Sequence, residues 1–146
     1  MTVPGAPPAK HVEIAQESYR RCEGEAFFVS FYRRLLASHA SIPPMFEKTD
    51  FKRQHKLLQH ALGLLLSYAR RPNPALLERI GLRHARGDLD VEPTLYPYFV
   101  DSIIGAVREF DSQCDPEVEQ AWRAALAPGI GFMTSLYGGA PERAEP

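Results

Sequence analysis

Cysteine is scarce in this sequence, and its two occurrences, Cys22 and Cys114, are far apart. They belong to no C-x-x-C or C-x-x-C-H pattern, which excludes a zinc ribbon and a covalently attached c-type haem. We expect both thiols to be buried or half-buried.

Charge of one sign is not in excess either, because the formal net charge is −1. Such a chain has no overall electrostatic attraction to nucleic acid.

Long hydrophobic runs are missing as well. The longest, residues 62–66, falls far short of the roughly 20 apolar residues that a membrane-spanning helix needs. Residues 1–8 contain prolines but no basic stretch followed by an apolar one, so they do not resemble a secretory signal peptide. We therefore expect no membrane span and a cytoplasmic location.

Alternation of apolar and polar residues is absent over any long stretch, whereas spacings of three and four residues recur through the middle of the chain. These spacings predict one all-α domain over residues 9–137, between flexible ends at 1–8 and 138–146. A chain of 146 residues can bury one sizeable core. The predicted helices span residues 9–22, 25–38, 50–69, 74–86, 92–110 and 115–137.

Capping residues and prolines predict where the helices begin. Thr49 is the expected N-cap of the third helix. Asn73 and Asp115 each precede a proline, which predicts an N-cap followed by the first helical position at both places. Pro128 is expected to bend the last helix.

Among the five histidines, only His84 has apolar neighbours at helical spacing on one side, namely Leu77 and Ile80. An imidazole with apolar neighbours on one side is compatible with a position in an apolar binding pocket. A histidine beside an apolar stripe is, however, more often a structural residue that bonds to the backbone. Spacing alone therefore leaves both roles open for His84.

The longer string around this histidine, LERIGLRHARG at residues 77–87, is followed by Val91 and by Tyr96. It resembles the bacterial globins, and the segments 49–54 and 121–133 are most similar to the single-domain and sensor-type members. In that family a histidine near the end of one helix binds haem iron, and a Val/Pro/Tyr pattern opens the next helix under the haem. The resemblance implies a globin fold around a buried, non-covalent haem b, with His84 as the axial iron ligand.

Residues upstream extend the resemblance, which covers most of residues 12–137. Phe46 follows a proline-bearing turn, as the corner phenylalanine of globins does, and is expected to stack on the haem. Tyr32 lies fourteen residues earlier. It takes the position on the second helix that, in globins, points at the open side of the iron and is tyrosine in many bacterial members.

The pattern of the third helix allows more than one residue over the iron. Gln54 is the preferred choice, because it places Leu58 one turn later against the haem and Phe51 one turn earlier in the core. The alternative for Gln54 is a solvated position on the helix surface.

Two other registers stay open. If Arg53 stood over the iron, Leu57 would line the pocket; if His55 did, an amide at Gln59 would have to be buried, which is unfavourable. His55 and His60 fall on the polar side of the helix, where solvated imidazoles are usual. A second histidine on the iron is therefore not expected.

Several other side chains are expected to surround the haem. Arg83 is a candidate partner for a haem propionate, and the apolar members pack against the macrocycle. The full set predicted to contact the haem is Phe31, Phe46, Leu57, Leu58, Ile80, Arg83, Val91, Tyr96 and Val100.

These expectations favour reversible binding of O2, or of NO or CO, at five-coordinate iron, for carriage or sensing, over an enzymatic role. A sensor would need a signalling partner or a homodimer, for which the last two long helices are the candidate interface. The alternative is an enzyme of the NO dioxygenase type. That activity would depend on an external reductase.

Overall fold

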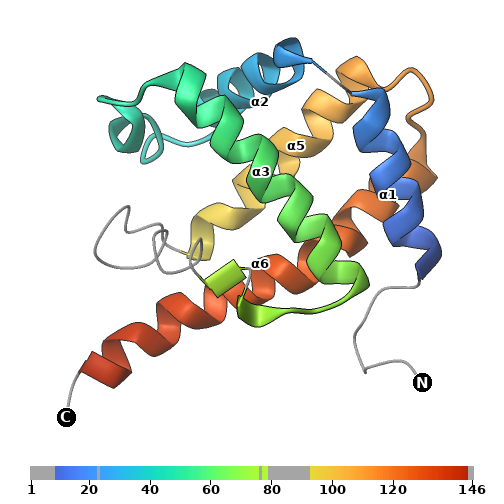
Figure 1. The fold of residues 1–146 in the computed structure, drawn as a ribbon. Coiled ribbons are helices and arrows are strands. Elements are labelled where there is room, and N and C mark those ends of the chain that lie inside the picture. Colours follow the sequence, from blue (N-terminus) through green and yellow to red (C-terminus); the bar gives the residue numbers. More distant parts are fainter. Residues whose placement is uncertain (1–8, 23, 76, 79–92, 145–146) are drawn as a thin grey trace.

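The computed structural model describes residues 9–22, 24–75, 77–78 and 93–144. Every regular element within these ranges is helical, which confirms the all-α prediction. In chain order (Figure 1) they are α1 (Ala9–Arg21), α2 (Glu25–Ser38), the 3-10 helix η1 (Pro43–Phe46), α3 (Phe51–Arg70), the 3-10 helix η2 (Pro93–Leu95), α5 (Tyr96–Phe110) and α6 (Pro116–Ala144).

The N-cap of α3 is Asp50 and not Thr49. The Asp50 carboxylate accepts hydrogen bonds from the backbone N–H groups of Lys52, at 3.1 Å, and Arg53, at 3.5 Å. Its carbonyl also accepts the helical bond from Gln54, at 2.9 Å. The prediction of Thr49 was wrong by one residue, because the carboxylate bonds two N–H groups that the first turn would otherwise leave unpaired.

The other two predicted caps are confirmed. The Asn73 side chain accepts a hydrogen bond from the backbone N–H of Ala75 at 3.2 Å. The Asp115 carboxylate accepts one from the backbone N–H of Val118 at 2.8 Å. A proline follows each cap, where its missing N–H costs no helical bond.

The last helix is longer than predicted. It continues to Ala144, beyond the expected end at residue 137, and Pro128 lies within it without ending it. None of the helices in the described part of the chain is long and apolar enough to cross a membrane.

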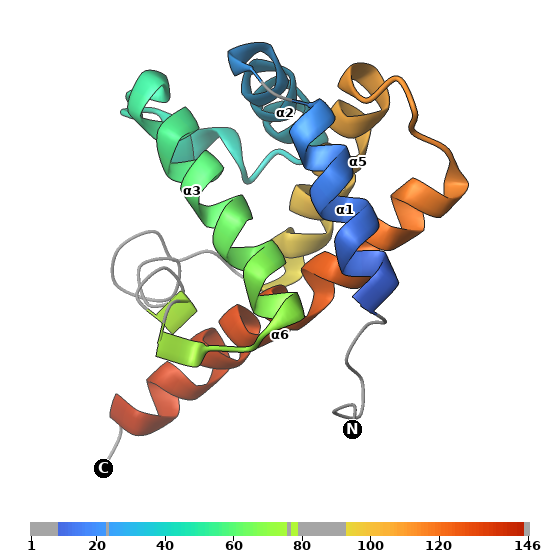
Figure 2. The same ribbon diagram turned by 45° about the vertical axis from the view of Figure 1, so that its right-hand side comes forward.

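The helices pack largely in pairs. α1 and α3 both lie on α6, while α2 lies on α5. Figure 1 shows α6 passing beneath the other helices toward the C-terminus, and the turned view in Figure 2 shows α1 and α3 crossing the same side of it. The centre of the core contains Phe27, Ile103 and Trp122, each at most 1% exposed.

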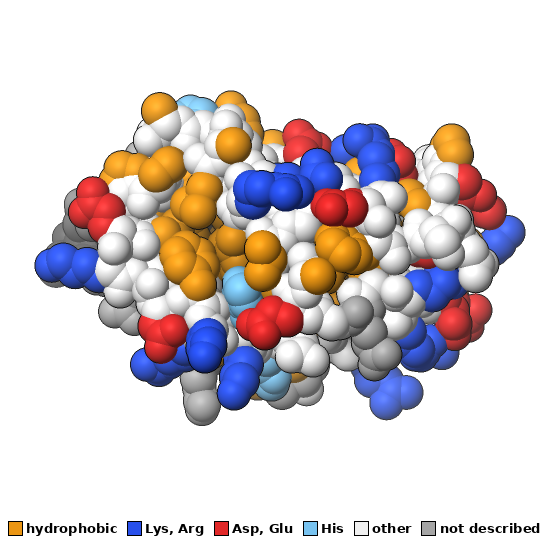
Figure 3. Space-filling model, turned by 90° about the horizontal axis from the view of Figure 1, so that it is seen from above, with side chains coloured by type: hydrophobic (Ala, Val, Ile, Leu, Met, Phe, Trp, Pro, Cys, Tyr) orange, Lys and Arg blue, Asp and Glu red, His pale blue; other side chains and the backbone are white. Residues whose placement is uncertain are grey.

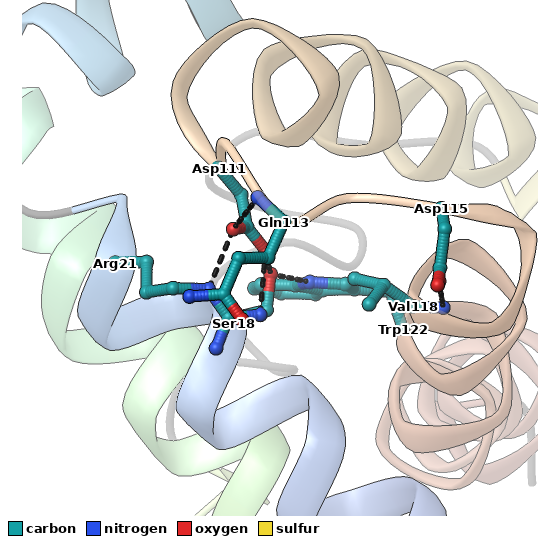
Figure 4. Close-up of polar contacts among 7 residues, drawn as sticks. All are labelled: Ser18, Arg21, Asp111, Gln113, Asp115, Val118 and Trp122. Carbon is teal, nitrogen blue, oxygen red and sulfur yellow. Dashed lines mark hydrogen bonds and ion pairs between the residues drawn. The ribbon is translucent and has the colours of Figure 1, made fainter.

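A buried polar cluster joins α1, the end of α5 and α6 (Figure 4). The Asp111 carboxylate, which has no exposed surface, accepts bonds from Arg21 Nε at 2.6 Å and Nη2 at 2.9 Å. It also accepts from Ser18 Oγ at 2.6 Å and from the backbone N–H of Gln113 at 2.9 Å. Trp122 Nε1 donates to Ser18 Oγ at 2.8 Å. Burial acts to raise the pKa of Asp111, but these donors outweigh it and hold the pKa below its ordinary value.

Candidate functional site

A cavity lies among α2, η1, α3, α5 and α6. Its wall is mainly aliphatic and aromatic, and few polar side chains reach it. Small molecules and cofactors usually bind in cavities of this kind. The described residues that line it are Phe31, Tyr32, Leu35, Ile42, Met45, Phe46, Gln54, Leu57, Leu58, His60, Ala61, Leu65, Leu77, Leu95, Tyr96, Phe99, Ile130 and Met133.

Tyr32 reaches the cavity from α2 and is 5% exposed. Its ring packs edge-on against Phe46 and Phe51, with centroid distances of 5.7 and 5.4 Å. Burial raises the pKa of the Tyr32 hydroxyl to about 12, while a hydrogen bond with the Gln54 side chain acts in the opposite direction. Near neutral pH the hydroxyl therefore keeps its proton and can donate a hydrogen bond.

Gln54 reaches the same cavity from α3 and is half-buried. One turn later Leu58 is buried in the cavity wall, and Leu57, 37% exposed, lies at its margin. Arg53 is exposed and lines a separate surface hollow. Because residues three and four apart share a helix face, this register turns Gln54 toward the cavity, and Arg53 and His55 away from it.

Phe46 reaches the cavity from the last position of η1. Its ring stacks on Phe51 with a centroid distance of 6.0 Å and an interplanar angle of 26°. The prolines at 43 and 44 open this short helix, where their fixed backbone angle is compatible with the turn. The turn thereby places an aromatic ring against the cavity.

The structure brings together many of the residues predicted to surround a haem, but not all of them. Val100 is half-buried against the core and does not line the cavity. His84, the predicted iron ligand, lies outside the described residues, as do Ile80, Arg83 and Val91. The predicted residues that do line the cavity are Phe31, Tyr32, Phe46, Gln54, Leu57, Leu58 and Tyr96.

Sequence reasoning missed other parts of the wall. Ala61 and Leu65 continue the helical repeat that begins at Gln54, so extending that repeat along α3 would have identified them. Ile130 and Met133 reach the cavity from α6. No signal near them in the sequence distinguishes cavity residues from ordinary core.

The two histidines of α3 lie in different surroundings. His60 is exposed, as predicted, and lines the cavity. His55 is not solvated, because its side chain is only 12% exposed and its ring lies within 25° of the planes of Phe28 and Tyr32. The prediction for His55 was wrong, since aromatic rings of α2 cover this side of α3 and the pattern of α3 alone does not reveal them.

Comparison with known proteins identifies the family. The globin family model matches residues 29–130. This chain belongs to the globin family. It is also similar to a solved protein from Pseudomonas aeruginosa PAO1, described as structurally highly homologous to a human hemoglobin, with 37% sequence identity and a TM-score of 0.84 over 87% of this chain and 98% of that chain. No curated protein matches the sequence.

Membership of this family implies haem binding and, in general, a haem-based gas-binding function. The cavity of this globin is compatible with such a group. Phe46, Leu58 and Tyr96 offer apolar surface for a flat macrocycle, while Tyr32 and Gln54 add neutral polar groups in one region of the wall.

Proposed function

We propose that this globin reversibly binds O2, or another diatomic gas such as NO or CO, at the five-coordinate iron of a non-covalently held haem b. The proposed axial ligand is His84. When bound, the haem supplies iron that takes the gas as a ligand and shifts electron density onto O2. The observation that supports the proposal most strongly is that Tyr32 and Gln54 meet in one apolar cavity.

Tyr32 and Gln54 would act as hydrogen-bond donors to a gas molecule in the cavity. Each bond is worth about 0.5–1.5 kcal/mol, and more when the acceptor carries charge. The surrounding apolar wall lowers the local dielectric, which strengthens such bonds. O2 gains more negative charge than CO, so both residues would favour O2 in relative terms.

His84 would bind the iron through the lone pair of a neutral imidazole. A bond from its other ring N–H to a nearby carbonyl would set the tautomer and tune the strength of the ligand.

A visible absorption spectrum tests the proposal. Purified protein from haem-sufficient cells should show a strong Soret band, and His84→Ala should lose the band or bind haem weakly. The matched control is His11→Ala on α1, which does not line the cavity and should keep the band. A colourless wild-type protein with full helicity would refute the proposal.

The physiological use of the gas stays a prediction. Three uses are open. The protein could carry the gas, sense it through a homodimer of the last two long helices or through a signalling partner, or oxidise NO with an external reductase. These uses require different binding and kinetic properties. Carriage needs a measurable O2 affinity with slow autoxidation, whereas the enzymatic role needs NO consumption when a reductase is added. Those three measurements separate the roles.

A further inference from the structure

Glu25 and His55 form a pair that bridges α2 and α3. His55 Nδ1 lies 2.9 Å from Glu25 Oε2, and the two side chains are 12% and 65% exposed. An ionised carboxylate can only accept, so His55 donates this bond from Nδ1. Figure 3 shows the molecule from above, a face on which histidine, acidic and basic side chains lie beside hydrophobic ones.

The His55 ring also lies against the ring of Tyr32. Their centroids are 5.6 Å apart and their planes differ by 20°. On α2, Glu25, Phe28 and Tyr32 follow one another at spacings of three and four residues, so they form one stripe facing His55. Phe28 is stacked on His55 as well, at 6.1 Å and 25°. The imidazole is therefore held in place by a bond at Nδ1 and by contact with two nearly parallel aromatic rings.

Two residues of α3 therefore contact different parts of the Tyr32 side chain. Gln54 meets its hydroxyl at the cavity, whereas His55 meets the face of its ring outside the cavity wall. A tyrosine oxygen lies on the Cβ–Cγ axis of a rigid ring, so it changes place only when the whole ring swings about the Cα–Cβ bond. A side chain packed against the ring opposes this swing and therefore also holds the hydroxyl in place.

We propose that His55 is a positioning residue, anchored by Glu25, that sets the orientation of the Tyr32 ring and thereby the place of its hydroxyl in the cavity. This inference rests on the proposed gas-binding function. His55 does not line the cavity, so it would act on a bound gas only through Tyr32.

A double-mutant cycle tests the inference on the haem-loaded protein. His55→Ala should raise the O2 dissociation rate about threefold to tenfold, because the Tyr32 hydroxyl would lose its fixed place. In the Tyr32→Phe background the same change should have no further effect. Glu25→Ala removes the anchor from an exposed position and should act in the same direction without disturbing the packed rings. Gln59→Ala, an exposed change one turn along α3, is the matched control.

Fluorine NMR provides a readout that is independent of gas kinetics. With fluorotyrosine at the six tyrosines, the Tyr32 signal is assigned by its loss in Tyr32→Phe. In the CO-bound protein, His55→Ala and Glu25→Ala should shift or broaden this signal, and Gln59→Ala should leave it unchanged.

The outcomes separate this inference from the proposed function. If Tyr32→Phe alters O2 dissociation but His55→Ala and Glu25→Ala do not, the positioning role is refuted and the gas-binding role of Tyr32 stands. An effect of His55→Ala that persists in the Tyr32→Phe background refutes positioning as well. If Tyr32→Phe itself has no effect, the role of Tyr32 fails, and the inference fails with it.

Discussion

Gly129 on α6 lies directly against Leu65 on α3. A Cβ atom added at Gly129 would stand 2.5 Å from Leu65 Cδ2 and 3.2 Å from Leu77 Cδ1. Leu65 and Leu77 both line the cavity. The absence of a side chain at Gly129 therefore lets α6 approach α3 closely and shapes this part of the wall.

We predict that Gly129→Ala destabilises the protein. The new methyl group would force Leu65 to move, and overpacking of this kind costs about 1–3 kcal/mol. This penalty opposes the gain of about 1 kcal/mol that alanine brings to a helix interior. Urea unfolding of the haem-loaded protein measures the difference. The control is Gly131→Ala, where a Cβ atom meets nothing within 4 Å; equal stability changes in the two variants would contradict the prediction.

Asp111→Asn should destabilise the protein by about 2–3 kcal/mol at neutral pH, because the buried carboxylate accepts charge-assisted bonds from Arg21. The pKa of Asp111 is lowered in the folded state, so the unfolded chain takes up this proton at a higher pH than the folded one. The stabilisation is thus fully present above the ordinary carboxyl pKa and is lost as pH falls through the lowered value. The difference in unfolding free energy between wild type and Asp111→Asn should therefore shrink on acidification.

The exposed pair of Arg108 and Glu119 provides the control for this measurement. Its two bonds, of 2.6 and 2.7 Å, are as short as those at Asp111, but the Arg108 side chain is 59% exposed. Exposed pairs contribute about 0–1 kcal/mol. Glu119→Gln should therefore lower the unfolding free energy much less than Asp111→Asn. A similar loss in the two variants would show that burial does not determine the strength of the Asp111 interactions.

The two thiols should react at very different rates. Cys22 is buried and Cys114 half-buried, as the sequence led us to expect. Burial raises the pKa of Cys22 to about 12 and also raises that of Cys114. Because the thiolate is the reactive form, a thiol reagent near neutral pH should label Cys114 slowly and Cys22 only on unfolding. Cys114→Ser should abolish labelling of the folded protein, and labelling that continues in this variant would show that Cys22 is accessible.

Local signals in the sequence predicted most helices of the described residues, while the predicted helix at 74–86 lies largely outside them. The helical spacings and the caps at Asn73 and Asp115 depend on neighbouring residues only, so they could be interpreted without the fold. Thr49 failed as a cap because the adjacent Asp50 is the stronger capping residue, a preference that the prediction overlooked.

Long-range contacts could not be predicted in the same way. His55 appears polar on its own helix, and only the packing of α2 against α3 shows that it stacks on Tyr32. Asp111 occupies the loop after α5, where an acidic residue is usually solvated, yet Arg21 and Ser18 come from the other end of the chain. The cavity residues Tyr32 and Phe46 were predicted through family resemblance, which carries such long-range information.

The distal role of Tyr32 gives the sharpest prediction about function. Tyr32→Phe removes the hydroxyl but keeps the ring that packs against Phe46, Phe51 and His55. Loss of one hydrogen bond to bound O2 should raise the O2 dissociation rate about tenfold, which corresponds to about 1.4 kcal/mol. CO dissociation should change much less, because CO gains little negative charge.

Stopped-flow measurement of both gases on wild type and Tyr32→Phe provides the test, and Gln54→Leu gives the companion variant. Gln54 approaches the same hydroxyl, so its loss removes one donor and also a neighbour of Tyr32. If both residues bond to the same gas molecule, the effects of the two substitutions on O2 dissociation should not add, since contacting residues are coupled. Equal O2 dissociation rates in wild type and Tyr32→Phe would refute the hydrogen bond from Tyr32 to the gas and leave Gln54 as the remaining candidate donor.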